Sequence, residues 1–193
     1  MPGGNEALEG RLVSIAASSP WFTPCLTAVR GLGLASWCIG AGAVRDLVWD
    51  SLHGMSAPSA LADVDAAYFE PADAGAGRDE ALRRQLTAAL PGVPWEVTNQ
   101  AGVHLWCEAC FGHPVAALAS LEDAVASWLE YATAVGPTLD ADGIIHVMAP
   151  HGLDDLFSMV VRRNPTRVSL ETYRRRIQEK RYAERWPKVT IIS

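Results

Sequence analysis

The sequence predicts a layered domain of the α/β or α+β class, in which strands alternate with helices. Short apolar runs of strand character are separated by longer segments whose apolar residues recur with the helical period. The 193 residues are 49% apolar and 20% charged, the composition of a globular chain long enough to bury a core. No internal repeat or long linker divides the chain, so we expect one domain over residues 1–193.

The net charge and the lack of membrane and signal-peptide patterns disfavour several classes of protein. A formal net charge of −6 disfavours a broad nucleic-acid surface, because clustered lysines and arginines carry phosphate binding. No apolar stretch is long enough to cross a bilayer, and the opening "MPGGNEALEG" lacks the charged-then-apolar pattern of a signal peptide. We therefore predict a cytoplasmic protein without membrane association. The sequence carries no signal for an oligomeric state.

The N-terminal part, residues 1–34, is expected to contain two helices. Apolar residues on one stripe predict the first over 5–18, and Pro20 ends it. The second is expected over 24–32, before a glycine-rich turn.

The central part, residues 35–150, carries the expected sheet. Periodicity and turn residues predict, in order, a strand at 34–40, a helix at 43–53, strands at 63–69 and 95–100 separated by a helix at 80–90, a helix at 121–131, and two strand-like runs at 133–139 and 143–149. Asp79 is the expected N-cap of the helix at 80–90. The remaining part, residues 151–193, is predicted to be helical over 153–161 and 169–186.

A glycine-containing strand-to-helix junction, "WCIGAGAVRD", is the first candidate for binding chemistry. Gly40 and Gly42 let the backbone approach a ligand closely, and the N-terminus of the following helix offers free N–H groups to an anion. Arg45 in the first turn can add a guanidinium fork for phosphate. The alternative is that Arg45 and Asp46 form a solvated pair of no consequence.

Two aspartates open the next strand, in "DVDAAYF". Side chains two residues apart share one face of a strand, so Asp63 and Asp65 point the same way while Val64 points into the core. Adjacent carboxylates repel unless a cation lies between them, and Mg²⁺ prefers one or two carboxylates plus substrate phosphates. The alternative is an ordinary cap or turn at the start of the strand. The glycine-containing junction upstream favours the metal site.

These two motifs together resemble the nucleotidyltransferase superfamily shared by DNA polymerase β, the CCA-adding enzymes and the antibiotic nucleotidyltransferases. "AGAVRD" looks like the Gly-Gly-x-x-Arg-Asp of the CCA-adding branch, with Ala41 in place of the first glycine and Gly40 as a substitute. The segments "WEVTNQAGVHLW", "ATAVG", "APHGLDDLF" and "WPK" are similar to a bacterial nucleotidyltransferase-like family of unassigned substrate. The resemblance covers about residues 37–188. It implies an α+β, polymerase β-like fold with a mixed sheet flanked by helices, and a catalytic core over residues 35–150.

The resemblance also implies site residues. Asp63, Asp65 and a third carboxylate on a neighbouring strand, for which Glu96 is the candidate, are expected to be catalytic and to bind Mg²⁺ or Mn²⁺. The alternative for Glu96 is an exposed strand residue. Three polar residues that follow it, Asn99, Gln100 and His104, are candidates for substrate binding or, equally, for satisfying loop backbone.

Two further clusters leave alternatives open. His104, Cys107, Cys110 and His113 have ligand-type side chains, but only one Cys-x-x-Cys is present, so ordinary thiols are favoured over structural zinc. The last helix has a run of basic residues with aromatic neighbours. A run of charges usually forms a solvated face, which is the favoured interpretation, and the alternative is a surface on which the aromatic residues stack bases. Its members are Arg174, Arg175, Arg176, Lys180, Arg181 and Arg185, with Tyr173, Tyr182 and Trp186.

The expected function is transfer of a nucleoside monophosphate from a nucleoside triphosphate to an acceptor by a two-metal mechanism. Gly40, Gly42 and Arg45 would bind the phosphates. The acceptor is open among small molecule, protein and RNA, and the lack of a large RNA-binding domain disfavours a tRNA-tailing role. The alternative is a catalytically inactive nucleotide-binding or interaction module on the same fold.

Overall fold

Three strands form the central sheet, which is mixed as expected. The computed structural model describes residues 3–73, 75–104, 116–166 and 168–192. The sheet has the order β1 (Trp37–Gly40), β2 (Val64–Tyr68), β3 (Trp95–Asn99), with β1–β2 antiparallel and β2–β3 parallel. The predicted strands and the mixed α+β architecture are thereby confirmed, with each strand shorter by one or more residues than its apolar run.

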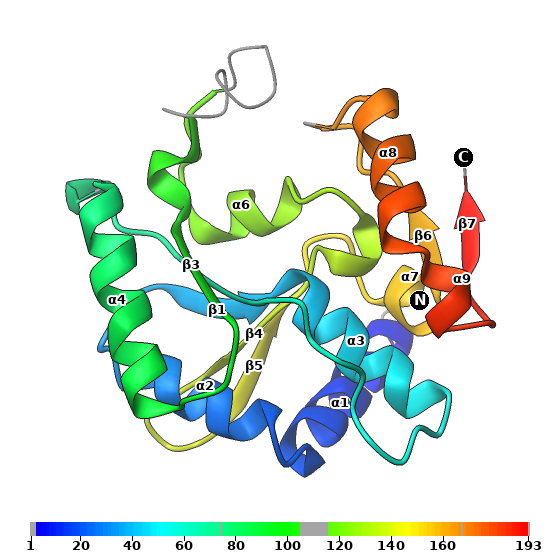
Figure 1. Ribbon diagram of the computed structural model, residues 1–193, viewed down its shortest axis with the longest axis horizontal. Helices are drawn as coiled ribbons and strands as arrows, with labels where there is room; N and C mark the ends of the chain where they lie inside the picture. The colour runs from blue at the N-terminus through cyan, green and yellow to red at the C-terminus, as the bar shows by residue number, and fades with distance from the viewer. Residues whose placement is uncertain (1–2, 74, 105–115, 167, 193) are drawn as a thin grey trace.

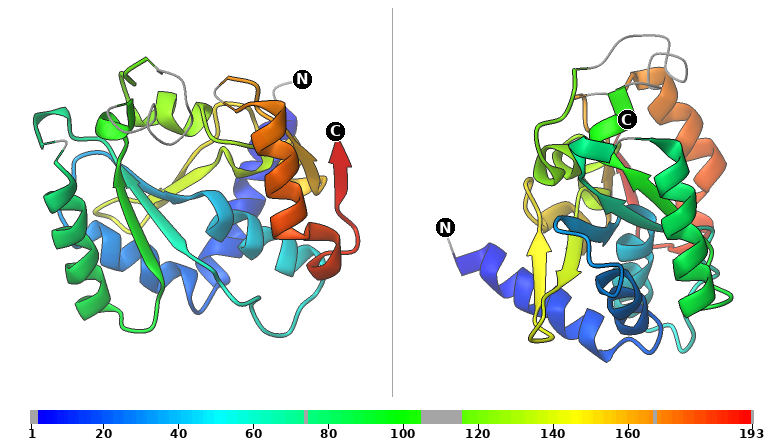
Figure 2. Two further views of the ribbon diagram at one scale, coloured as in Figure 1. Left: turned by 45° about the horizontal axis from the view of Figure 1, so that its top comes forward. Right: turned by 90° about the vertical axis from the view of Figure 1, so that its left-hand side faces the viewer.

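Helices flank this sheet on several sides (Figure 1). α4 (Ala76–Ala89) packs along β3, and α3 (Ala41–Leu52) follows β1 and contacts β2. α1 (Gly3–Ser18) and α2 (Phe22–Arg30) pack against each other, with α1 against α3 and α2 against β1. In Figure 1 and in the left view of Figure 2, α4 and α8 (Leu170–Lys180) lie on opposite sides of β2 and β3. The strands β2 and β3 therefore lie between α4 and the C-terminal helix α8 in these views.

Two small two-stranded sheets complete the fold. β4 (Gly136–Leu139) and β5 (Ile145–Met148) form an antiparallel hairpin whose first strand packs on β1. β6 (Val160–Arg162) pairs in parallel with β7 (Thr190–Ile192). The hairpin confirms the two strand-like runs predicted before residue 150.

The prediction that residues 153–161 and 169–186 are each one helix is wrong in two places. α7 (Asp154–Phe157) ends early, because Met159 has a left-handed φ of 54° and the chain then enters β6. The last helix is interrupted at Arg181, whose φ of 44° separates α8 from α9 (Tyr182–Arg185). The helix expected over 121–131 is also shorter, since α6 covers Leu121–Ala126.

The core contains large aromatic side chains from segments far apart in the sequence. Its largest fully buried members include Trp49 on α3, Tyr68 on β2, and Tyr173, Tyr182 and Trp186 from the C-terminal segment. The C-terminal segment is therefore part of the core.

The expected N-cap role of Asp79 is also wrong. Asp79 lies inside the first turn of α4, where its Oδ1 accepts hydrogen bonds from the hydroxyl of Tyr68 (2.6 Å) and the backbone N–H of Asn99 (3.1 Å). This carboxylate therefore ties the helix to β2 and β3.

Over the described residues, no single helix has both the length and the hydropathy needed to cross a membrane. The segments Gly4–Ser18 and Phe22–Arg30 reach these values only as a pair, and the chain bends by 91° between them.

Candidate active site

A cavity of about 370 Å³ lies on the face of the sheet that carries Asp65 and Glu96. Its size is within the range of small-ligand sites in proteins. One wall consists of β2, β3 and the N-terminus of α3, and the other comes from residues 127–133 and α8. Charged and polar side chains lining it include Asp63, Asp65, Glu96, Thr98, Arg176 and Lys180.

The three carboxylates singled out in the sequence meet in this cavity. Asp63 immediately precedes β2, and the alternation of side chains directs it to the same face as Asp65. The parallel register places Glu96 directly beside Asp65. Thr98, two residues further along β3, lines the same cavity, whereas Val97 is buried on the opposite face. The geometry thus agrees with the expected grouping, and the catalytic role of these residues stays a prediction.

The surroundings of Asp65 raise the pKa of its carboxyl group. Burial, followed by the charges of Asp63 and Glu96, raises the pKa of Asp65 to about 7, against the opposing effect of Arg176. A cation at this point would relieve that repulsion.

These side chains suit a hard divalent cation. They offer oxygen donors only, and Asp65 lies within range of the charges of Asp63 and Glu96. Among the residues that the structure describes, no group of three acidic, histidine or cysteine side chains is arranged to hold an ion unaided. Mg²⁺ needs only one or two protein carboxylates when water and phosphates complete its shell, so Asp63 and Asp65 fit it.

The glycines of the junction before α3 differ in their surroundings. Gly40 is buried, and a Cβ there would overlap the ring of Trp128, so its missing side chain makes room for that ring. Gly42 lines the cavity, and a Cβ there would reach 3.5 Å from Asp63 Oδ1. Between them, Ala41 has a left-handed φ of 52°. Of the two glycines, Gly42 is therefore the one placed to approach a ligand.

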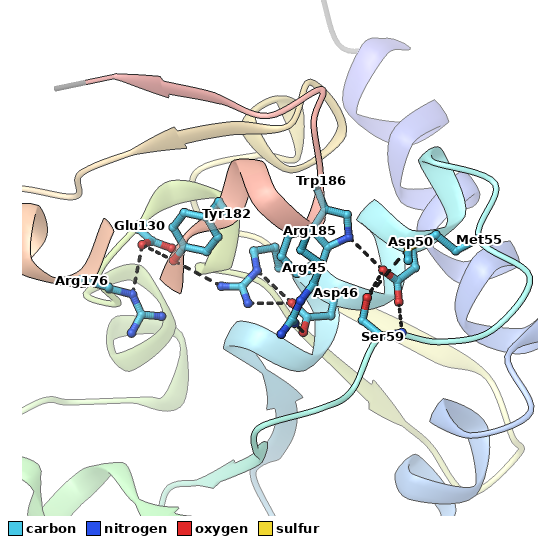
Figure 3. A network of polar contacts seen from close by, with 10 residues as sticks. All are labelled: Arg45, Asp46, Asp50, Met55, Ser59, Glu130, Arg176, Tyr182, Arg185 and Trp186. Atoms are coloured by element: carbon cyan, nitrogen blue, oxygen red, sulfur yellow. Dashed lines mark hydrogen bonds and ion pairs between the residues drawn. The ribbon is translucent and has the colours of Figure 1, made fainter. Parts of the chain in front are cut away.

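Arg45 is buried in an internal network instead of reaching into the main cavity (Figure 3). Its Nη2 and Nε donate to Asp46 Oδ1 at 2.6 and 3.0 Å, and its side chain is 4% exposed. The guanidinium lies 5.0–5.5 Å from the ring centroids of Trp49, Tyr182 and Trp186. These contacts are cation–π contacts, which join α3 to α9. The sequence alternative of a solvated Arg45–Asp46 pair is wrong, because both residues are buried.

A smaller cavity of about 250 Å³ adjoins the main one. Arg45 lines this smaller cavity and not the main one. Both cavities share Gly42, Asp63 and Lys180. That Arg45 binds phosphate stays a prediction, and the phosphate would then lie in the smaller cavity.

Glu130 connects Arg45's surroundings to the main cavity. This carboxylate is fully buried, and its Oε1 accepts hydrogen bonds from Arg176 Nε (3.0 Å) and the Tyr182 hydroxyl (2.8 Å), as Figure 3 shows. Burial alone would lower the pKa of Arg176, but the charges and hydrogen bonds of Glu130 and Tyr182 together outweigh it and raise that pKa. Arg176 is therefore held as a cation at the cavity wall.

The three polar residues predicted to bind substrate lie in different surroundings. Gln100 lines the main cavity. Asn99 is buried and uses its amide to hold loop backbone, accepting from Glu70 and Ala101 N–H and donating to Glu70 and Asp73 carbonyls, which is the structural alternative. His104 is not among the described lining residues, and its buried Nδ1 has no hydrogen-bond partner within the described parts of the chain. Cys107, Cys110 and His113 lie outside the described residues.

Sequence reasoning missed the basic wall of the cavity. Arg176 and Lys180 were expected on a solvated or base-stacking helix, and Glu130 carried no recognised signal. Tyr173, Tyr182 and Trp186 are buried in the core, so they are not available to stack a base. The spacing of Arg176 and Lys180, four residues apart on one helix face, is the signal that could have indicated the wall.

Comparison with solved structures gives the same fold. The chain matches, with a TM-score of 0.80 and 27% identity over 95% of both chains, a solution structure reported to reveal a CCA-adding enzyme head domain. It also matches the Thermotoga maritima CCA-adding enzyme complexed with tRNA (TM-score 0.56, 13% identity, 96% of this chain, 42% of that one). An apo tRNA-processing enzyme gives a TM-score of 0.51 at 17% identity over 87% of this chain and 44% of that one.

The chain thus spans less than half the length of those two enzymes, and these two likenesses concern the fold. No functionally curated protein matches the sequence. Residues 27–191 match the family described as Nucleotidyltransferase. With that match covering most of the sequence, the chain belongs to the nucleotidyltransferase family.

Proposed function

We propose that this chain is a metal-dependent nucleotidyltransferase that moves a nucleoside monophosphate from a nucleoside triphosphate to an acceptor. The observation that carries the proposal is the convergence of Asp63, Asp65 and Glu96 on one cavity beside the N-terminus of α3. A purely structural domain gains nothing from three like charges held together, since their repulsion is unfavourable until a cation is bound.

Asp63 and Asp65 are the proposed ligands for Mg²⁺, and Mn²⁺ suits the same oxygen donors. Glu96 has two proposed roles, which are to complete a second metal site and to assist deprotonation of the acceptor hydroxyl. When bound, such ions neutralise phosphate oxygens and stabilise the charge that develops as pyrophosphate leaves. The N–H groups at the start of α3 and the backbone at Gly42, which lines the cavity without a side chain, would receive the phosphates.

The chain's own acid–base step falls to Glu96, which is the most exposed of the three carboxylates. A carboxylate oxygen of Glu96 accepts the proton of the acceptor hydroxyl. The hydroxyl oxygen then bonds to the α-phosphorus while the bond from that phosphorus to the bridging oxygen of pyrophosphate breaks, and the electron pair leaves with pyrophosphate.

The acceptor is one of three classes: small molecule, protein or RNA. The likeness to a tRNA-bound CCA-adding enzyme, at 13% identity over 42% of that chain, concerns the fold and does not select among these classes. The proposal keeps the cytoplasmic location and the lack of membrane association expected from the sequence.

The first test is thermal unfolding with Mg²⁺ and each nucleoside triphosphate. A ligand at about 100 times its dissociation constant stabilises the native state by about 2.7 kcal/mol, which raises Tm by about 5–10 °C. The second test incubates the protein with α-labelled nucleotides and a cell extract and identifies the labelled product. Asp63→Asn should abolish both the rise in Tm and the formation of labelled product. A wild-type Tm that does not change with any of the four nucleotides would refute the proposal.

The second candidate is a nucleotide-binding or interaction module without turnover. The buried engagement of Arg45 by Asp46 and three aromatic rings favours it, because this guanidinium is not free in the main cavity. Magnesium-dependent nucleotide binding without labelled product in any extract would select this module over the enzyme.

A further inference from the structure

The wall of the main cavity that faces the carboxylates is basic. Arg176 and Lys180 lie four residues apart on α8, so their side chains share one face of the helix. Both line the cavity that contains Asp63, Asp65 and Glu96. Lys180 also lines the adjoining smaller cavity, at the place where the two cavities share Gly42 and Asp63.

Arg176 and Lys180 both have N–H donors that form no hydrogen bond or ion pair with the described residues. Arg176 donates from Nε to Glu130, and its side chain remains 23% exposed. A guanidinium has five N–H donors, and Figure 3 shows the terminal nitrogens of Arg176 on the side away from Glu130. Lys180 is half-buried and makes no ion pair with any residue in the described part of the chain. Donors on both side chains are therefore available to a ligand.

Glu130 fixes the orientation of Arg176. Its buried Oε1 receives both the Arg176 Nε–H and the Tyr182 hydroxyl, so the guanidinium is held between a core carboxylate and the cavity. Lys180 has no such partner, and its position on the same helix face is set by α8 alone.

We propose that Arg176 and Lys180 bind the outer phosphates of the triphosphate in this site and that Glu130 positions Arg176 for that role. This inference rests on the proposed nucleotidyltransferase function. A cavity with carboxylates on one wall and cations on the other suits a ligand that is anionic and also carries a divalent cation. A metal–triphosphate meets both walls: the carboxylates face the cation, and α8 faces the outer phosphate oxygens. Two cations at the outer phosphates also favour departure of pyrophosphate.

The test measures binding of α,β-methylene nucleoside triphosphates, which cannot transfer their nucleotidyl group, by calorimetry with Mg²⁺. Lys180→Met is the primary variant, since it removes the charge without breaking an ion pair among the described residues. Arg174→Met is its matched control, because Arg174 is exposed on the same helix and is not among the lining residues of either cavity. We expect Lys180→Met to weaken triphosphate binding about tenfold and monophosphate binding less than about twofold, with Arg174→Met unchanged.

Arg176→Gln alone leaves Glu130 buried without its cation and can unfold the protein. The double variant Glu130→Gln/Arg176→Gln keeps this network uncharged, and it should also lose triphosphate affinity about tenfold. Glu130→Gln alone keeps Arg176 but loosens its orientation, and we expect an intermediate loss that is again confined to the triphosphate. A loss that is equal for mono- and triphosphate would show that Glu130 is only structural.

Two failures are distinguishable. If the wild-type protein binds no triphosphate with Mg²⁺, or if Asp63→Asn binds it as well as wild type, the proposed function fails and this inference fails with it. If Asp63→Asn loses binding while Lys180→Met and the double variant bind like Arg174→Met, the proposed function stands and the role of α8 is overturned.

Discussion

At the scale of single residues, Ala41 adopts a backbone conformation that favours glycine. Its φ of 52° lies in the left-handed region, and this position corresponds to the first glycine of the motif that the sequence resembles. A non-glycine residue there costs about 1–2 kcal/mol, whereas the extra freedom of glycine in the unfolded chain costs about 0.5–1 kcal/mol.

The first prediction is that Ala41→Gly stabilises the protein, by about 0.5 kcal/mol in thermal or urea unfolding. Ala43→Gly is the matched control, because Ala43 is buried two residues further into α3 and should lose about 1 kcal/mol. Equal losses for the two variants would contradict the strain inferred at Ala41.

The carboxyl of Asp65 makes the stability of the metal-free protein depend on pH. Its pKa is about 7 in the folded protein, because of burial and the charges of Asp63 and Glu96, against about 3.9 in an unfolded chain. The folded state therefore holds this proton more tightly. The resulting stability is fully present below about pH 4 and is lost as the pH rises through about 7.

The second prediction is that Asp65→Asn raises the Tm of the metal-free protein relative to wild type, and that this difference grows between pH 5 and pH 8. The gain at pH 8 should be at least about 1 kcal/mol, or about 2–4 °C for a chain of this size. Asp142→Asn, a change at an exposed aspartate, serves as the control. A Tm difference that is constant over this pH range would remove Asp65 from the charge cluster.

At the scale of secondary-structure elements, Arg45 joins α3 to α9. Asp46 is 4% exposed and receives Arg45 and also Arg185 (3.3 Å), while Trp186 on the segment after α9 donates to Asp50 Oδ1 (2.8 Å). The third prediction is that Arg45→Met costs about 3 kcal/mol of stability, because it leaves the Asp46 carboxylate buried without its main partner.

The exposed pair of Arg84 and Glu80 on α4 supplies the control for Arg45. The side chain of Arg84 is 74% exposed, so Arg84→Met should change stability by less than about 0.5 kcal/mol. A wild-type Tm for Arg45→Met would show that the network does not stabilise the fold.

The register of β2 and β3 leads to the fourth prediction. Glu96 faces the cavity beside Asp65, whereas Val97 points into the core. Glu96→Gln should lower the single-turnover rate about a hundredfold or more and leave nucleotide affinity nearly unchanged, because the aspartate pair still anchors the ligand.

Two neighbours of Glu96 calibrate this measurement, which uses the acceptor identified in the labelling experiment. Thr98→Val changes the same face and should have a milder effect on the rate. Val97→Ala should cost stability without changing the dependence on Mg²⁺. Normal turnover by Glu96→Gln would leave only Asp63 and Asp65 in the site.

At the scale of the whole molecule, the sheet side of the site could be predicted from the sequence and the helical side could not. Alternation on one strand places Asp63 and Asp65 on the same face. Glu96 came from the family resemblance, which implies a third carboxylate on a neighbouring strand. The glycine-to-arginine junction was located, but the burial of Arg45 depends on aromatic rings about 140 residues away, which periodicity does not reveal.

The C-terminal segment shows why the helical side was missed. β6 and β7 have three residues each and pair across the whole of α8 and α9, so neither strand has a period that can be recognised locally. The break at Arg181 needs a left-handed residue where the sequence offers no glycine. Glu130 is indistinguishable in sequence from a surface glutamate, yet it is fully buried by α8 and α9. Pairings distant in sequence therefore determine the basic wall.

The last prediction concerns how a bound nucleotide couples these two halves. A metal–triphosphate held between the sheet and α8 should slow amide hydrogen exchange in β2, β3 and α8 together, because opening either wall would break contacts with the ligand. α4 lies on the other side of β3 and should exchange at its ligand-free rate (Figure 1). The measurement is hydrogen–deuterium exchange by mass spectrometry, with Mg²⁺ and an α,β-methylene nucleoside triphosphate at saturation. Lys180→Met should retain protection of the strands and lose most of it in α8. Protection of the strands alone in the wild-type protein would mean that the sheet holds the nucleotide without the C-terminal helix.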